Sequence, residues 1–214
     1  MQSRTPVTRK QRNLKTTSGL LALLIVASPV WSRSRLDPIY PYRVGGACPF
    51  ECCRFGDWIA LEPIKISAKE RDRRHFLGAV PAGSHFRAVN GALWSITPFV
   101  IRTGKATSEH VAKNLVVDTP NRAHIDPTAV NDIYTRVVEI PSGQDIHIVA
   151  DLGEGQVLGL WNQTPLWLED VIGIPDERPV DIRETEWWVE VRYGKKHGWI
   201  HALPNQIDAS DACR

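Results

Sequence analysis

The sequence lacks an apolar segment long enough to form a transmembrane helix. Its N-terminal apolar run, Leu20–Val30, has about 11 residues, whereas a helix that spans a bilayer needs about 20. Basic residues and no acidic ones precede this run, and Val30 and Ser32 suit positions −3 and −1 of a signal-peptide cleavage site. We expect residues 1–32 to be a cleaved secretory signal peptide, with an uncleaved signal anchor as the alternative. The mature protein would then be periplasmic or secreted.

The mature chain also lacks an excess of positive charge. The full sequence has 26 Lys and Arg residues against 24 Asp and Glu residues, but five basic residues and no acidic ones lie in residues 1–32. Removing that segment leaves 21 basic and 24 acidic residues, a net charge of −3 with histidine neutral. Nucleic-acid binding needs a basic surface, so we expect no nucleic-acid partner. We expect no membrane contact beyond the signal segment.

Familiar catalytic motifs are missing too. The sequence has no Gly-x-Ser-x-Gly, no phosphate-binding loop and no His-Glu-x-x-His. His197 and His201 lie four residues apart, but on an expected hairpin and not on a helix, so they are poor metal ligands as a pair. We expect a protein that is not an enzyme and has no cofactor and no metal. A free cysteine acting with a distant histidine is the alternative that would make it an enzyme.

Only four cysteines are present, Cys48, Cys52, Cys53 and Cys213, and all lie in the expected mature part. Export to an oxidising compartment favours two structural disulfides. A bond between the adjacent Cys52 and Cys53 would be strained. The other two connectivities join Cys213 to Cys52 or to Cys53 and give Cys48 the remaining partner. Either one ties a C-terminal tail, residues 205–214, to the start of the domain.

Helical patterns are scarce. Ser108–Leu115 has the pattern of two helical turns, and Asp126–Pro127 has that of one capped turn. Short β-rich segments and turn residues alternate elsewhere, about every ten residues, as in small barrels and sandwiches. The expected strand segments are Asp57–Glu62, Ile64–Ile66, Phe76–Val80, Phe86, Ala88, Leu93–Ile96, Phe99–Ile101, Ile133–Val138, Ile146–Val149, Gln156–Trp161 and Leu166–Leu168. We therefore expect an all-β fold with very little helix.

The clearest element is a β-hairpin near the C-terminus. Residues 187–192 alternate strictly, Tyr193–Gly198 form a turn bounded by glycines, and Trp199–His201 return the chain. The alternation divides the first strand into two faces. The residues predicted to face the core are Trp187, Val189 and Val191, and those predicted to face solvent are Trp188, Glu190 and Arg192.

A weak internal repeat occurs at an offset of 72 residues. Val80–Gly83 aligns with Leu152–Gly155, and Phe76 aligns with Ile148. Shared turn chemistry alone can produce such a match. Together with the strand spacing, it favours two related β modules.

Several of these segments resemble bacterial SH3-like domains. Trp188–Arg192 followed by Gly198–Ile200 is similar to their closing hairpin, and Leu152–Leu158 fits the segment before it. Ile64–Ile66, Phe76–Gly78 and Val80–Gly83 resemble the opening half of the same module. The first copy departs from the family pattern because it lacks a Gly-Trp-Val-type end. The Cys-containing lead-in resembles that of uncharacterised exported bacterial proteins with such domains.

The resemblance implies two tandem SH3-like small barrels packed together. We place the first module at residues 55–120 and the second at 130–204, after an extended lead-in at 33–54. In this broad family such modules often bind cell-wall peptides or act as accessory domains. A shared fold does not fix function.

Seven of the eight tryptophans lie in the expected mature chain. We assign Trp58, Trp187 and Trp199 to the core, because buried aromatic rings contribute much packing area. An exposed aromatic groove with nearby carboxylates suits extended peptides or sugar rings. The predicted ligand-binding residues are Trp188, Trp167, Trp161 and Glu154. We expect a non-catalytic binding module for cell-wall peptide or an envelope protein; the alternative is a structural or inhibitory partner of one specific envelope protein.

Overall fold

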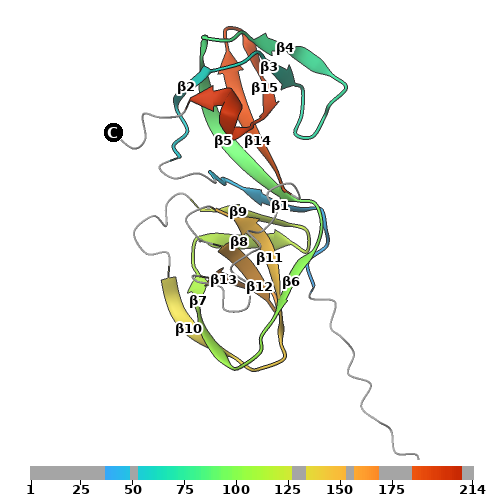
Figure 1. Ribbon diagram of the computed structural model, residues 1–214, viewed down its shortest axis with the longest axis vertical. Coiled ribbons are helices and arrows are strands. Elements are labelled where there is room, and N and C mark those ends of the chain that lie inside the picture. Colours follow the sequence, from blue (N-terminus) through green and yellow to red (C-terminus); the bar gives the residue numbers. More distant parts are fainter. Residues whose placement is uncertain (1–36, 49–52, 127–133, 153–156, 169–184, 209–214) are drawn as a thin grey trace, which may run out of the picture. The chain divides into compact units, whose positions relative to one another are not determined.

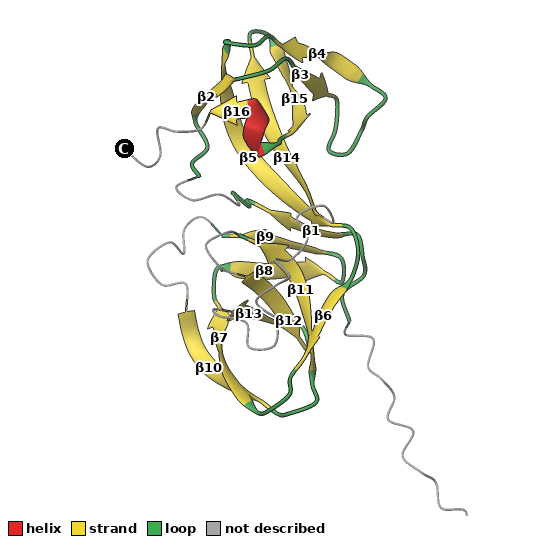
Figure 2. Ribbon diagram, viewed as in Figure 1, coloured by secondary structure: helices red, strands yellow, loops and turns green. Residues whose placement is uncertain are grey.

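The computed structural model describes residues 37–48, 53–126, 134–152, 157–168 and 185–208. In this part of the chain the fold is nearly all β, as expected, with 16 strands and one 3-10 helix, η2 (Pro204–Gln206) (Figure 2). Residues Ser34–Arg214 form one compact unit. Among the described residues there is no helix with the length and apolarity needed to span a membrane.

Seven strands form a set that we call the outer module. Six of them follow the order β4–β3–β15–β14–β5–β2, and β16 pairs with β2. The set takes residues from two distant parts of the chain, which lie together at one end of Figure 1. Its strands are β2 (Asp57–Ala60), β3 (Ile64–Ser67), β4 (Phe76–Val80), β5 (His85–Ser95), β14 (Thr185–Tyr193), β15 (Lys196–His201) and β16 (Ile207–Asp208).

A second set of six strands, the inserted module, forms a separate sheet. Its order is β10–β7–β13–β12–β11–β6, which repeats the order of the outer module strand for strand. All of its strands lie in the sequence between β5 and β14. Its strands are β6 (Phe99–Arg102), β7 (Thr107–Ala112), β10 (Tyr134–Ile140), β11 (Asp145–Asp151), β12 (Val157–Trp161) and β13 (Thr164–Leu168).

Equivalent turns confirm the correspondence between the two modules. Val80-Pro81-Ala82-Gly83 links β4 to β5, and Ile140-Pro141-Ser142-Gly143 links β10 to β11. Gly83 and Gly143 have φ of 74° and 80°, a left-handed conformation that glycine adopts without steric cost. Their amides donate to Ala60 O and Thr103 O, each at 2.7 Å. The repeat between these turns has an offset of 60 residues, and the alignment at 72 is therefore wrong.

The closing hairpins also match. Trp161 pairs with Thr164 in one and Tyr193 pairs with Lys196 in the other, so each turn has two residues. Trp167 and Trp199 then lie the same number of residues beyond the two turns. The C-terminal hairpin predicted from alternation is confirmed, with a tighter turn than Tyr193–Gly198.

Three further strands extend the sheet of the outer module. β1 (Tyr42–Gly45) pairs antiparallel with β5 and parallel with β9 (Arg122–Ile125), which pairs with β8 (Leu115–Thr119). Tyr42 and Val44 of β1 are fully buried. The lead-in expected to be extended and unpacked therefore supplies a strand in the middle of a sheet.

One hydrophobic cluster contains residues of both sheets, among them Trp58, Leu93 and Leu158. A second cluster belongs to the inserted module alone. Strand β11 contributes to both, because successive side chains of a strand point to opposite faces: Ile146 and Ile148 lie in the second cluster, and Val149 lies in the first. Side chains of the outer sheet and the lead-in also bond to the β11 backbone, from Ser95 Oγ to Val149 O at 2.7 Å and from Tyr40 Oη to Ile148 O at 2.8 Å.

The strand pairing differs from two sequence predictions. Residues 55–120 and 130–204 do not each form one strand set, because β6 and β7 pair with strands of the second segment and β14 pairs with β5. The segment Ser108–Leu115, expected to form a helix, instead contains most of β7, a turn and the first residue of β8, and Val111 and His110 of β7 pair with β13. Tertiary pairing outweighs the local helical pattern there. The turn expected at Asp126–Pro127 extends outside the described residues.

Candidate functional site

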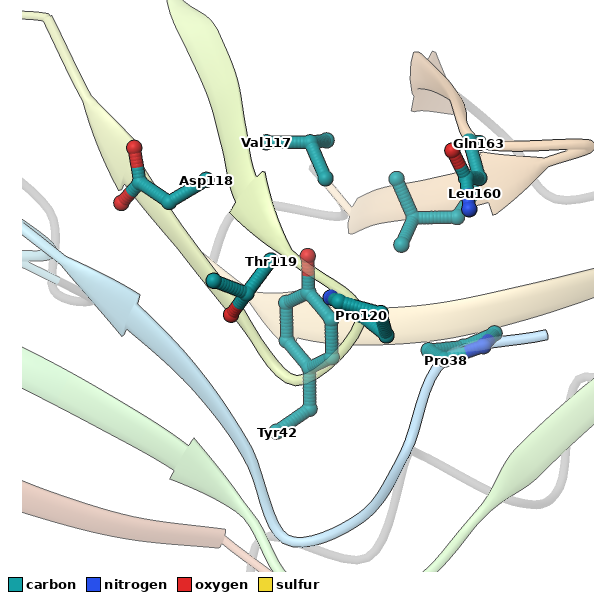
Figure 3. A pocket seen from close by; sticks show the side chains of 8 residues that line it. All are labelled: Pro38, Tyr42, Val117, Asp118, Thr119, Pro120, Leu160 and Gln163. Atoms are coloured by element: carbon teal, nitrogen blue, oxygen red, sulfur yellow. The ribbon is translucent and has the colours of Figure 1, made fainter. Parts of the chain in front are cut away.

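A cavity of about 150 Å³ lies where β1, β8 and the β12–β13 hairpin meet (Figure 3). We call it the Tyr42 cavity. Its walls come from three separate parts of the sequence. The lining residues are Pro38, Tyr42, Val117, Asp118, Thr119, Pro120, Leu160 and Gln163.

Tyr42 forms the inner end of this cavity. The residue has no solvent exposure, because its side chain packs in the hydrophobic cluster that contains residues of both sheets. Its hydroxyl oxygen is buried and has no hydrogen-bond partner among the described residues. Desolvation by burial raises the pKa of the Tyr42 phenol above its ordinary value, and the negative charge of Asp118 raises it further. The hydroxyl is therefore neutral and retains both its donor and its acceptor capacity.

Strand β8 and the turn after it supply most of the mouth. Asp118, Thr119 and Pro120 are exposed, whereas Val117 is partly buried. The Asp118 carboxylate lies 3.0 Å from His124 Nδ1 and 3.8 Å from Arg122 Nε. These neighbours orient the carboxylate but leave part of its acceptor capacity unused, because each oxygen can accept two hydrogen bonds.

Gln163 reaches the mouth from the two-residue turn between β12 and β13. Asn162 and Gln163 have φ of 48° and 62°. Asparagine tolerates the left-handed region, but a glutamine there costs about 1–2 kcal/mol relative to an ordinary conformation. Leu160, two residues before the turn, is 3% exposed and forms an apolar wall. The side-chain amide of Gln163 is thus placed at the mouth by a residue whose backbone conformation is unfavourable.

The lead-in packs along the opposite wall. Pro38 lines the cavity, and Asp37 Oδ1 lies 3.4 Å from His147 Nε2. His147 pairs across the sheet with Leu160. Its Nδ1 and the Tyr42 hydroxyl are the two buried side-chain polar atoms without a partner in the described part of the chain. Both therefore lie next to residues that line the Tyr42 cavity.

The structure places the predicted ligand-binding tryptophans elsewhere. Trp188 and Trp167 are 1% and 5% exposed, so the prediction that they form an exposed patch is wrong. Trp167 Nε1 donates to Asn114 Oδ1 at 3.0 Å. Trp161 is partly exposed and does not line the cavity, and Glu154 lies outside the described residues.

Trp188 is buried although it lies on the face predicted to be exposed. The β3–β4 loop covers this face through ion pairs of Arg71 and Arg73 with Glu186, each at 3.0 Å. Trp188 Nε1 also donates to Glu186 Oε2 at 3.0 Å.

Next to these contacts, Glu70 of the same loop accepts hydrogen bonds from Arg43 and from Trp94 Nε1. Trp58 and Trp187 are buried as predicted, whereas Trp199 is partly exposed and not a core residue.

Cys48 and Cys53 form a disulfide with a Cα–Cα distance of 5.4 Å. This pair belongs to the connectivity that joins Cys213 to Cys52, and both of those residues lie outside the described part of the chain. The bond links Cys48, three residues after the end of β1, to Cys53, and β1 is the strand that carries Tyr42.

The described residues contain no group of three or more His, Cys, Asp or Glu side chains with the geometry to hold a metal ion. Comparisons with protein-family models, with curated proteins and with solved structures found no match to this chain.

Proposed function

We propose that the protein is an exported, non-catalytic binding protein of the cell envelope that takes a group of cell-wall peptide into the Tyr42 cavity. The unpartnered Tyr42 hydroxyl carries this proposal. A buried polar group without a partner costs about 1–3 kcal/mol, and a ligand that bonded to it would recover that cost.

The geometry of the cavity supports binding better than catalysis. Tyr42 is held in a sheet, and its raised pKa keeps the phenol neutral, which suits a hydrogen-bond donor and not a base. Asp118 is oriented by His124 at the mouth. A preformed site of this kind binds without reordering its side chains, which favours affinity.

The shape of the cavity supports an extended chain as ligand. A volume of about 150 Å³ is well below the roughly 300–1,000 Å³ of sites that enclose a whole small molecule. It suits one side group of a longer chain that runs across the mouth. Pro38, Pro120 and Leu160 offer apolar contact to that group, and Gln163 and Thr119 offer hydrogen bonds beside it.

Both modules are proposed to be SH3-like barrels, in agreement with the resemblance of the closing hairpin. The shared strand order of the two modules and the equivalent Trp167 and Trp199 support a common module type. In this account the two sheets build the ligand site together: β1 and β8 of the outer sheet supply Tyr42 and the mouth, and the β12–β13 hairpin of the inserted module supplies Leu160 and Gln163.

A protein partner in the envelope is the second candidate. Phe76 and Leu77 are each 45% exposed on β4, which lies at the edge of the outer sheet. Lys65 Nζ lies 4.9 Å from the centre of the Phe76 ring. An edge strand with exposed apolar side chains can pair with a strand of another protein. Loss of partner binding in Leu77→Lys with wall binding unchanged would favour this role for β4.

Co-sedimentation of the disulfide-intact protein with isolated peptidoglycan sacculi tests the main proposal. We expect binding that survives moderate salt, because the cavity is mostly apolar. Tyr42→Phe should remove most of it, and Tyr193→Phe, a matched change outside the cavity, should not. Equal binding by wild type and Tyr42→Phe would reject the cavity as the site.

A further inference from the structure

The polarity of the Tyr42 cavity changes from its inner end to its mouth. At the inner end the Tyr42 hydroxyl stands among apolar side chains, since Leu160 and Val117 line the same space. Figure 3 shows the hydroxyl directed between the side chains of Val117 and Pro120. At the mouth, Asp118 and Gln163 are exposed and offer hydrogen-bond acceptors. A ligand group that accepts a hydrogen bond from the Tyr42 hydroxyl at its inner end and donates one to Asp118 or Gln163 nearer the mouth is complementary to this arrangement.

The inner end selects against charge. A carboxylate or an ammonium taken out of water there would find one neutral phenol as its polar partner. Burying a charge without an opposite charge costs much more than burying a neutral polar group. A carboxylate would in addition approach Asp118, whose negative charge already acts on Tyr42. An ammonium would pair with the exposed Asp118 at the mouth, so the group that reaches the Tyr42 hydroxyl at the apolar inner end is neutral.

From this arrangement we propose that the Tyr42 cavity recognises a secondary amide that carries a methyl group. The methyl contacts Leu160 and Val117, the carbonyl oxygen accepts a hydrogen bond from the Tyr42 hydroxyl, and the amide N–H donates to Gln163 or Asp118 at the mouth. This inference rests on the proposed function in taking the cavity as the ligand site. It goes further by naming the chemical group that enters.

Two parts of peptidoglycan carry this chemistry. The acetamido groups of its amino sugars and the alanyl residues of its peptides each place a methyl next to a secondary amide. Their surroundings differ, because the first extends from a sugar ring and the second from a peptide backbone. The cavity itself defines the shared amide, and binding measurements can separate the two sources.

Titrations followed by NMR test the proposal on the intact, disulfide-bonded chain. The neutral probes are N-acetylglucosamine and N-acetyl-alanine methylamide, and the charged probes are acetate and methylammonium. We expect at least one neutral probe to shift the methyl signals of Val117 and Leu160, with a Kd at least about tenfold lower than that of either charged probe. Tyr42→Phe should weaken that probe by about tenfold, and Tyr193→Phe should leave it unchanged.

The outcomes separate this proposal from the proposed function. Tighter binding of the sugar would assign the glycan as source, and tighter binding of the alanyl probe would assign the peptide. Charged probes that bind equally well, or amide binding that is unchanged in Tyr42→Phe, would overturn the amide assignment. Sacculus binding that depends on Tyr42 without any effect of the amide probes would leave the function standing and reject this inference. Amide binding that depends on Tyr42 without any sacculus binding would support the amide assignment and reject wall binding as the function.

Discussion

Tyr42 and Gln163 line one cavity from different sheets, and each residue has a feature there that is energetically unfavourable for the fold. The Tyr42 hydroxyl is buried without a partner, and Gln163 has a left-handed backbone at φ 62°. Neither feature stabilises the fold. Their occurrence around a single cavity is the pattern expected when residues are kept for a ligand at some cost in stability.

The first prediction concerns the stability of Tyr42→Phe. Phenylalanine keeps the ring in the core and removes the unpartnered hydroxyl, so the free energy of unfolding should stay equal or rise by about 1 kcal/mol. Thermal or urea unfolding of both proteins measures this. Tyr40→Phe is the contrasting control, because the Tyr40 hydroxyl donates to Ile148 O and its loss should destabilise the protein by about 1 kcal/mol. A clear loss of stability in Tyr42→Phe would show that its hydroxyl is satisfied within the fold.

Gln163→Gly is predicted to keep or raise stability while weakening ligand binding. Glycine relieves about 1–2 kcal/mol of left-handed strain and costs about 0.5–1 kcal/mol of backbone entropy. Lys195→Gly is the matched control: Lys195 holds the equivalent turn position in β14–β15 and is not among the left-handed residues. It should lose a little stability and leave binding unchanged. If Gln163→Gly bound as tightly as wild type, the amide would have no role at the mouth.

Trp188→Ala is predicted to destabilise the protein by about 3–5 kcal/mol, because it removes a large side chain that is 1% exposed. Arg192→Ala, on the same face of the same strand but exposed, should change stability by less than about 0.5 kcal/mol. Urea denaturation separates the two. Similar midpoints for Trp188→Ala and wild type would mean that the β3–β4 loop does not cover this face in solution.

The Glu186 ion pairs predict a pH dependence of stability. Burial by itself would raise the pKa of Glu186, but the hydrogen bonds from Trp188 and Arg71 and the charges of Arg71 and Arg73 lower it overall from the ordinary value of 4.5. A carboxyl whose pKa is lower in the folded state stabilises the fold above its unfolded pKa. That contribution is lost as the pH falls through the lowered folded pKa.

Glu186→Gln should therefore be less stable than wild type at pH 7, and the difference should shrink as the pH falls below about 4.5. Melting temperatures between pH 7 and pH 3 measure it. A difference that is the same at every pH would show that the loss comes from packing and not from the charge.

The sequence was sufficient for the fold class and for the C-terminal hairpin, because alternation and turn residues act locally. The burial of Trp188 could not be predicted in this way. Alternation places it on an outward face, and the loop that covers that face bonds to Glu186 from Arg71, 115 residues earlier. The alternation of residues within one strand contains no information about a loop that is distant in sequence and packs over that strand.

The internal repeat was placed at the wrong offset for a related reason. The turns that follow β4 and β10 are 60 residues apart, whereas the closing hairpins are only 32 apart, because one module is inserted in the other. A single offset cannot align both ends. The matching Pro-x-Gly turns after Val80 and Ile140 were the local signal that could have revealed the offset of 60.

The candidate site was the least predictable part. Tyr42 lies in a Pro-rich segment that suggests an extended lead-in, and its burial depends on pairing with β5 and β9. Gln163 gives no signal in the sequence, because glutamine is not a typical residue for the left-handed turn position it occupies. Sequence reasoning favoured tryptophans for binding, but most of these rings are buried in the core.

The most direct test of the central claim is isothermal titration of wild type and Tyr42→Phe with soluble peptidoglycan fragments, on samples whose melting temperatures have been measured. The account predicts that Tyr42→Phe is at least as stable as wild type and binds at least about tenfold more weakly. Equal affinity in the two proteins would contradict the claim that the Tyr42 hydroxyl is kept for a ligand.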